Sequence, residues 1–241
     1  MFKTRTATFP LIGMNMILFL VQVILGETFT NSFTLVPADI LIRPWILITS
    51  MFLHGSFAHL FFNMYALLIF GPIVESRIGK RRFYFMYFLS GIFAAIGYSL
   101  MSTMPALGAS GAIMGLLGVT IILLPDLPVL FFFFIPMSLR TAGIIFALID
   151  IFGVFNPASG IAHWAHLFGL ATGLIYGIYL LKKRKHFQES FDTLKKYSEP
   201  TPKSKAKKTH KQEIRNADFS YSEKIQLTDS DIDNYLKNGR L

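Results

Sequence analysis

Apolar residues along the chain form six blocks, separated by charged or turn-rich segments. An α-helix needs roughly 17 to 25 apolar residues to cross a hydrocarbon core about 30 Å thick, and blocks of about this length are typical of membrane spans. The pattern therefore predicts an all-α polytopic membrane protein, a bundle of six transmembrane helices. The predicted spans are residues 9–25, 57–74, 83–101, 109–124, 137–155 and 161–181.

Composition agrees with this pattern. Of the 241 residues, 53% are hydrophobic and 15% are charged, and the mean hydropathy is +0.50, which disfavours a soluble fold. One apolar run, residues 131–134, precedes Pro136, and proline is poorly tolerated inside a helix. We expect this run at the start of the fifth span or just before it.

Basic residues between the spans set the predicted orientation, because short loops rich in Lys and Arg stay cytoplasmic. The opposite side has only Arg43, so both termini are predicted to be cytoplasmic, in agreement with an even number of spans. A cleaved signal peptide is disfavoured, because no small-residue cleavage site follows Leu25. The residues on the predicted cytoplasmic side are Lys3, Arg5, Arg77, Lys80, Arg81, Arg82, Arg140, Lys182, Lys183, Arg184 and Lys185.

The end of the chain differs in composition from the rest. Residues 186–241 are rich in Lys, Ser, Thr and Pro and poor in large apolar residues, which is typical of disorder. We expect a membrane domain over residues 1–185 and a largely disordered cytoplasmic tail over residues 186–241, with a short helix near Ile232. Such a basic tail beside a membrane indicates contact with anionic lipid headgroups rather than nucleic acid, and a purely solvated tail is the alternative.

Strongly polar residues inside spans are energetically costly and therefore indicate function. Three such clusters open the second, fourth and sixth spans, at residues 54–63, 108–111 and 163–166. His59, Ser110 and His166 each lie 16 residues before a charged residue at the cytoplasmic end of their span. That separation is about 24 Å of helix. We therefore expect the three side chains in one layer of the membrane, several ångströms below the extracytoplasmic surface.

This layer holds the residue types of a serine hydrolase. Neutral imidazole can take the proton of a serine hydroxyl, so Ser110 and His166 form a candidate nucleophile and base. His59 and Asn63 share one helical face and can donate to an oxyanion, as can the Ser110 N–H at the start of its helix. Glycines let membrane helices approach closely, and close approach of spans four and six would bring Ser110 beside His166. These glycines are Gly111, Gly115, Gly118, Gly169 and Gly173.

The other polar residues of this layer have simpler interpretations. We expect His54 and His163 to pack the starts of their helices, and Asp150 to bond to a neighbouring helix near the outer surface. A proton-relay group is the alternative role for Asp150. A histidine-based metal site or metal transporter is an alternative, but no His-Glu-x-x-His motif is present, so neither a metal nor a cofactor is predicted. The chain has no cysteine, which excludes disulfides, thiol catalysis and cysteine-ligated metals.

Over residues 9–181 these clusters resemble the signature of the rhomboid family of intramembrane serine proteases. The resemblance is specific because it is distributed over three spans. It is carried by His54-x4-His59-x3-Asn63, by Gly108-x-Ser110-Gly111 and by Ala165-His166-x2-Gly169-x3-Gly173. Glu75-Ser76-Arg77 also looks like the family's Glu-x-Arg after the second span, and Trp45 takes the place of the tryptophan in its first-loop Trp-Arg pair.

The resemblance implies a serine endopeptidase that cleaves transmembrane segments of other membrane proteins. Ser110 would be the nucleophile and His166 the general base, in a dyad without an acidic third member. His59, Asn63 and the Ser110 N–H would form the oxyanion hole.

The implied fold is a six-helix bundle in which residues 26–56 lie against the membrane face. A cavity open to the extracytoplasmic side would bring water to the dyad. The arrangement of six spans with none before them is similar to that of prokaryotic members, so a prokaryotic plasma membrane is expected.

Two positions depart from the family pattern. Ile46 stands where many members have Arg after the first-loop tryptophan, and Arg43 is a candidate to replace that Arg. Met114 stands where some members place a Tyr on the catalytic histidine, so we expect a looser orientation of His166 with activity kept. The alternative within the family is a non-enzymatic rhomboid-like protein that binds membrane clients. Loss of the serine or the histidine would mark it, and both are present.

Overall fold

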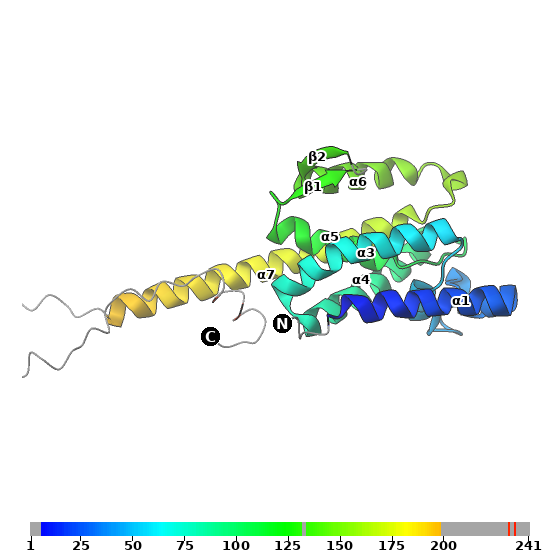
Figure 1. The fold of residues 1–241 in the computed structure, drawn as a ribbon, viewed down its shortest axis with the longest axis horizontal. Coiled ribbons are helices and arrows are strands. Elements are labelled where there is room, and N and C mark those ends of the chain that lie inside the picture. Colours follow the sequence, from blue (N-terminus) through cyan, green and yellow to red (C-terminus); the bar gives the residue numbers. More distant parts are fainter. Residues whose placement is uncertain (1–5, 132–133, 199–230, 232–233, 235–241) are drawn as a thin grey trace, which may run out of the picture. The chain divides into compact units, whose positions relative to one another are not determined.

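The computed structural model describes residues 6–131, 134–198, 231 and 234, and Figure 1 shows their helices and strands. The chain divides after Leu181 into two units. The described part of the second unit is the continuation of the last helix, together with Asp231 and Asn234. The helix expected near Ile232 and most of the expected tail lie outside the described residues, and the domain boundary after residue 185 stays a prediction.

Each predicted span coincides with a helix of the structure. The helices are α1 Thr8–Phe33, α2 Ile46–Thr49, α3 Phe57–Ile78, α4 Lys80–Met101, α5 Ser110–Leu123, α6 Leu139–Gly153 and α7 His163–Ser198. Short 3-10 helices lie at η1 Pro37–Asp39, η2 Ser50–Phe52 and η3 Pro157–Ser159, and the strands are β1 Pro128–Phe131 and β2 Ile135–Ser138. The described residues thus form a mostly helical bundle.

Among the described residues, four helices are long and apolar enough to cross a membrane, namely α1, α3, α4 and α7. Helix α5 is apolar but has only 14 residues, about 21 Å of helix. It is buried continuously from Gly111 to Thr120, so it is surrounded by protein rather than lipid and its length need not match the bilayer. The six-span count stays a prediction.

The core lies where α4 packs against α5. Buried aromatic and aliphatic side chains of α4 interlock with those of α5 and α3 in one continuous cluster. Burial of each large side chain contributes about 1.5 to 3 kcal/mol where its alternative is water. The largest side chains of this cluster include Phe83, Met86, Tyr87, Leu67, Leu116 and Val119.

Helices α5 and α7 touch backbone to backbone. A Cβ atom added to Gly169 would lie 2.0 Å from the carbonyl oxygen of Gly111, and one added to Gly173 would lie 1.9 Å from that of Gly115. Only glycine fits at such contacts. The close approach of these two helices, predicted from the glycine spacing, is confirmed.

Several boundaries differ from those predicted. Helix α7 continues to Ser198, past the predicted end of the sixth span at residue 181, so residues 186–198 of the tail that was expected to be disordered are helical. The fifth helix begins at Leu139 instead of Met137, because Met137 pairs with Val129 in the hairpin of β1 and β2, and the Ser138 hydroxyl then accepts the Thr141 N–H to cap α6. The apolar run at residues 131–134 therefore lies before the helix. Helix α1 breaks at Gly26 (φ 71°) but resumes and ends at Phe33, so part of the expected loop is helical.

Replacing Gly173 by Ala is expected to destabilise the protein by about 1 to 3 kcal/mol. The added methyl group would meet the Gly115 carbonyl, a backbone atom that can move only if α5 and α7 separate. Thermal unfolding in detergent measures the change. Gly13→Ala is the matched control, because a Cβ there has no neighbour within 4 Å. Equal unfolding temperatures for the Gly173 variant and the wild type would contradict this account.

Candidate active site

Three helices begin at the polar clusters, and residues of all three clusters line one cavity. Helix α3 begins after Ser56, whose hydroxyl accepts the His59 N–H at 3.1 Å and caps the helix. Helix α5 begins at Ser110 itself, and α7 begins at His163. Of these three helix starts, that of α3 is fixed by a side-chain cap, and His59 lies in its first turn.

The hydroxyl of Ser110 lies 2.8 Å from Nε2 of His166. Ser110 is placed by the turn before it, where Gly108 adopts a φ of +128° and donates its N–H to the Ser50 carbonyl at 2.9 Å. Residues with side chains rarely adopt this conformation. A Cβ at Gly108 would also lie 2.9 Å from Nε2 of His59. Gly108 therefore lets the imidazole of His59 approach the serine.

His59 and Asn63 lie one helical turn apart beside Ser110. The Gly55 N–H donates to Nδ1 of His59 at 3.4 Å, so the proton of this imidazole is on Nε2, the atom that faces Gly108. Asn63 donates one amide hydrogen to the His59 carbonyl at 2.8 Å, and its NH₂ group has a second hydrogen to donate. Both side chains can thus present donors to the space near Ser110.

His54 and the first helix fix the chain before α3. His54 is buried, with its ring centroid 5.1 Å from that of His59. Burial, together with the neighbouring His59, lowers the pKa of His54 from 6.5 to about 4, so the side chain is neutral at pH 7. Its backbone N–H donates to Oε1 of Gln22 at 2.9 Å, and Nε2 of Gln22 donates to the His54 carbonyl at 3.4 Å. The prediction that His54 packs the start of its helix is confirmed.

Gln22 was not singled out from the sequence. It could have been found because it is a polar residue inside the apolar block 9–25, and polar residues inside apolar blocks are what marked the three clusters.

Asp150 joins the end of α6 to the start of α7. Its Oδ1 lies 2.7 Å from Nδ1 of His163 and 2.9 Å from Nδ1 of His166. The expected bond to a neighbouring helix is confirmed, and His163 packs the start of α7 as expected. The family resemblance implies a histidine without an acidic partner, whereas here a carboxylate contacts His166 directly.

This trio has the donor types of a metal site, and its ligand atoms lie within 4.8 Å of one another. Neighbouring ligands around tetrahedral zinc, at bonds of about 2.0 to 2.1 Å, are roughly 3.3 Å apart. The two separations of 2.7 and 2.9 Å are shorter than this and are those of hydrogen bonds. The geometry favours a hydrogen-bonded cluster.

The structure shows the contacts of Ile46 and Met114, the two residues that depart from the family pattern. Ile46 is fully buried in a cluster with Leu35 and Tyr98. Arg43 forms an ion pair with Asp39 and also donates to the Asn31 carbonyl, so it ties the segment between α1 and α3 to the end of α1. Met114 packs in an apolar cluster with Leu117, Leu139 and Leu170, and the looser orientation of His166 stays a prediction.

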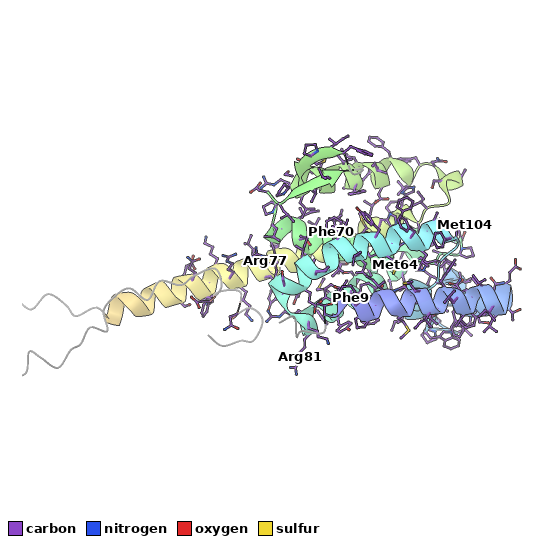
Figure 2. The ribbon with its side chains drawn as sticks, in the orientation of Figure 1. Phe9, Met64, Phe70, Arg77, Arg81 and Met104 are labelled. Carbon is purple, nitrogen blue, oxygen red and sulfur yellow. The ribbon has the colours of Figure 1, made fainter. Side chains whose placement is uncertain are left out.

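The candidate residues line a cavity of about 1060 Å³, bounded by α3, α5, α6, α7 and the segment after α4. Ser110, His166, His59 and Asn63 all contribute to its wall, so the structure brings together all four predicted site residues. Met104 is also on this wall, and Figure 2 shows it at the end of the first unit opposite Arg77 and Arg81.

Comparison with protein families agrees with the resemblance found from the sequence motifs. The family model described as the rhomboid domain matches residues 42–183, more than half of the chain. The chain belongs to the rhomboid family. Rhomboid membership and the apolar helices identify it as an integral membrane protein of a protease family.

Individual rhomboid relatives are moderately similar. YdcA of Bacillus subtilis (strain 168) is 35% identical over 143 residues, which cover 58% of this chain and 69% of YdcA. Rhomboid protease GluP of the same organism is 34% identical over 177 residues, 70% of this chain and 33% of GluP. The mitochondrial Rhomboid protein 1 of Saccharomyces cerevisiae is 30% identical over 192 residues, 75% of this chain and 56% of that protein. The chain thus spans about half or less of the latter two relatives.

Replacing Gln22 by Leu is expected to destabilise this rhomboid by about 1 to 3 kcal/mol, because the buried N–H and carbonyl of His54 lose their partners. Thermal unfolding in detergent measures the loss. Val23→Ala, at a neighbouring position where the side chain is 67% exposed, is the control and should change stability by less than about 0.5 kcal/mol. Equal losses in the two variants would show that Gln22 does not hold the segment.

Proposed function

We propose that this rhomboid is an intramembrane serine endopeptidase with Ser110 as nucleophile and His166 as general base. The observation that carries the proposal is the 2.8 Å contact between Ser110 Oγ and His166 Nε2 on the wall of a large cavity. A serine hydroxyl is a weak nucleophile until a neighbouring base accepts its proton. Such a pair inside an apolar bundle suits hydrolysis of a peptide bond that lies within a membrane.

In the first half of the reaction, Nε2 of His166 takes the Ser110 proton while Oγ attacks the scissile carbonyl carbon. The resulting oxyanion would accept hydrogen bonds from three donors: the Ser110 N–H, the second amide hydrogen of Asn63 and Nε2–H of His59. As the first residue of α5, Ser110 has an N–H without an intrahelical acceptor.

In the second half, His166 gives the proton to the leaving amine, and an acyl-enzyme ester remains on Ser110. A water molecule in the cavity then gives a proton to His166 and attacks the ester carbonyl. The serine leaves with that proton, and the free acid is released. The cavity volume of about 1060 Å³ leaves room for both a peptide segment and water.

The proposed substrates are transmembrane segments of other membrane proteins. We propose six spans with both termini cytoplasmic, because Arg77 and Arg81 lie at the end of the first unit opposite Met104 on the cavity wall. A prokaryotic plasma membrane is proposed as its location, in line with the Bacillus subtilis relatives. The cavity then opens to the extracytoplasmic side. The basic tail would contact anionic headgroups from the cytoplasm.

A fluorophosphonate probe is expected to label the detergent-solubilised wild type, because an activated serine attacks its phosphorus atom. Ser110→Ala should abolish labelling, and His166→Ala should reduce it to background. Gel fluorescence after incubation measures the reaction.

The matched control is Ser102→Ala, which removes another serine of the same cavity wall and should label as the wild type does. The assignment is wrong if the wild type stays unlabelled or if Ser110→Ala still reacts.

Asn63→Ala is expected to lower kcat by about 100-fold, the usual loss for one oxyanion donor. Ser110→Ala should cost far more, up to about 10⁶-fold, because the nucleophile itself is removed. Cleavage of a model transmembrane substrate measures both, with thermal unfolding recorded beside it. A collapse of the unfolding temperature in the Asn63 variant would instead show that its bond to the His59 carbonyl is structural.

A further inference from the structure

We propose that Asp150 is a positioning residue that holds His166 in the tautomer required of a general base, so that the site works as a Ser110–His166–Asp150 triad. The inference rests on the proposed function and deepens it. It starts from the position of a buried carboxylate, 4% exposed, one turn before the end of α6.

An ionised Asp150 sets the direction of each hydrogen bond. An ionised carboxylate can only accept, so Nδ1 of His166, 2.9 Å from Oδ1 of Asp150, must carry a hydrogen. Neutral imidazole has one N–H, and Nε2 is therefore bare. It lies 2.8 Å from Ser110 Oγ and accepts the hydroxyl hydrogen. The carboxylate thus selects the tautomer that can take the serine proton.

His163 holds the carboxylate in place. Its Nδ1 donates to the same Oδ1 at 2.7 Å, and its Nε2 accepts from the Ser159 hydroxyl at 3.1 Å. The ring lies against the backbone of Gly153, where an added Cβ would come within 2.6 Å of three ring atoms. Contacts on several sides fix this imidazole, so its N–H gives Oδ1 a second fixed partner beside His166.

Proton transfer gives Asp150 a second role. When Nε2 of His166 accepts the serine proton, the ring becomes a cation whose Nδ1–H points at the carboxylate. In the described part of the chain, the ion-pair partners found for Asp150 are His163 and His166, and its charge is not shared with a Lys or Arg there. Charges that meet away from water interact strongly. The carboxylate therefore stabilises the imidazolium as it forms.

Asp150→Asn is the main test. Asparagine keeps the shape, but its amide NH₂ can donate to Nδ1 and select the opposite tautomer. We expect kcat on a model transmembrane substrate to fall by about 100-fold or more, toward the roughly 10⁴-fold loss known for this exchange in serine-protease triads. KM should stay within about twofold and the unfolding temperature close to the wild type, because substrate contacts and packing are kept.

The matched control is Asp126→Asn, which removes an exposed carboxylate 3.5 Å from Arg140 and should leave kcat unchanged. His163→Phe keeps a ring against Gly153 but removes the second N–H to Asp150, and should lower kcat by less than about tenfold.

A purely structural role predicts the reverse pattern: a lower unfolding temperature for Asp150→Asn with kcat per folded molecule unchanged. That result would overturn the inference, as would a kcat within twofold of the wild type.

A measurement on the wild type keeps the inference testable if the variant does not fold. Nitrogen-15 NMR of histidine-labelled protein, with His166→Gln to assign the signal, distinguishes the two neutral tautomers. The proposal requires the Nδ1–H form of His166, and observation of the Nε2–H form would overturn it.

Fluorophosphonate labelling separates this inference from the proposed function. If the wild type labels, Ser110→Ala does not, and Asp150→Asn turns over normally, only the triad is wrong. If the wild type itself does not label, the protease assignment fails, and the triad fails with it.

Discussion

The backbone contact between α5 and α7 is the constraint from which the site follows. Gly169 meets the carbonyl of Gly111, the residue after Ser110, and lies less than one turn after His166. A side chain at that contact would push the two helices apart. The Ser110 hydroxyl and Nε2 of His166, 2.8 Å apart, would then no longer be within hydrogen-bond distance. A stripe of small residues thus sets the distance on which the proposed proton transfer depends, because in lipid such stripes let helices pack closely.

The polar groups are held at helix starts, where the backbone has unpaired N–H groups. The Ser56 hydroxyl caps α3, Ser110 begins α5, and the Gln22 side chain binds the His54 backbone from a third helix. The Ser56 hydroxyl and the Gln22 side chain thus each bind a backbone group of the segment around the start of α3. This satisfies groups that are expensive to bury, and it also restricts the orientation of the residues proposed to react.

Features governed by local pattern could be predicted from the sequence, whereas features set by the packing of distant ends could not. Apolar blocks predicted every long helix, and glycine spacing predicted the contact that brings Ser110 to His166. The hairpin before α6 was missed, because a run of phenylalanine beside a proline suits a strand or a helix start equally. The catalytic roles stay predictions, since contact alone does not establish chemistry.

The contact of Asp150 with His166 shows why such a feature escapes sequence reasoning. The two residues are 16 positions apart, and they meet where α6 ends and α7 begins, beside Gly153, which leaves room for the ring of His163. Neither residue type is unusual by itself at a helix end. What gives the carboxylate its significance is that one oxygen lies within hydrogen-bond distance of both imidazoles in a buried site, so the charge of Asp150 and the tautomer of His166 cannot be set independently.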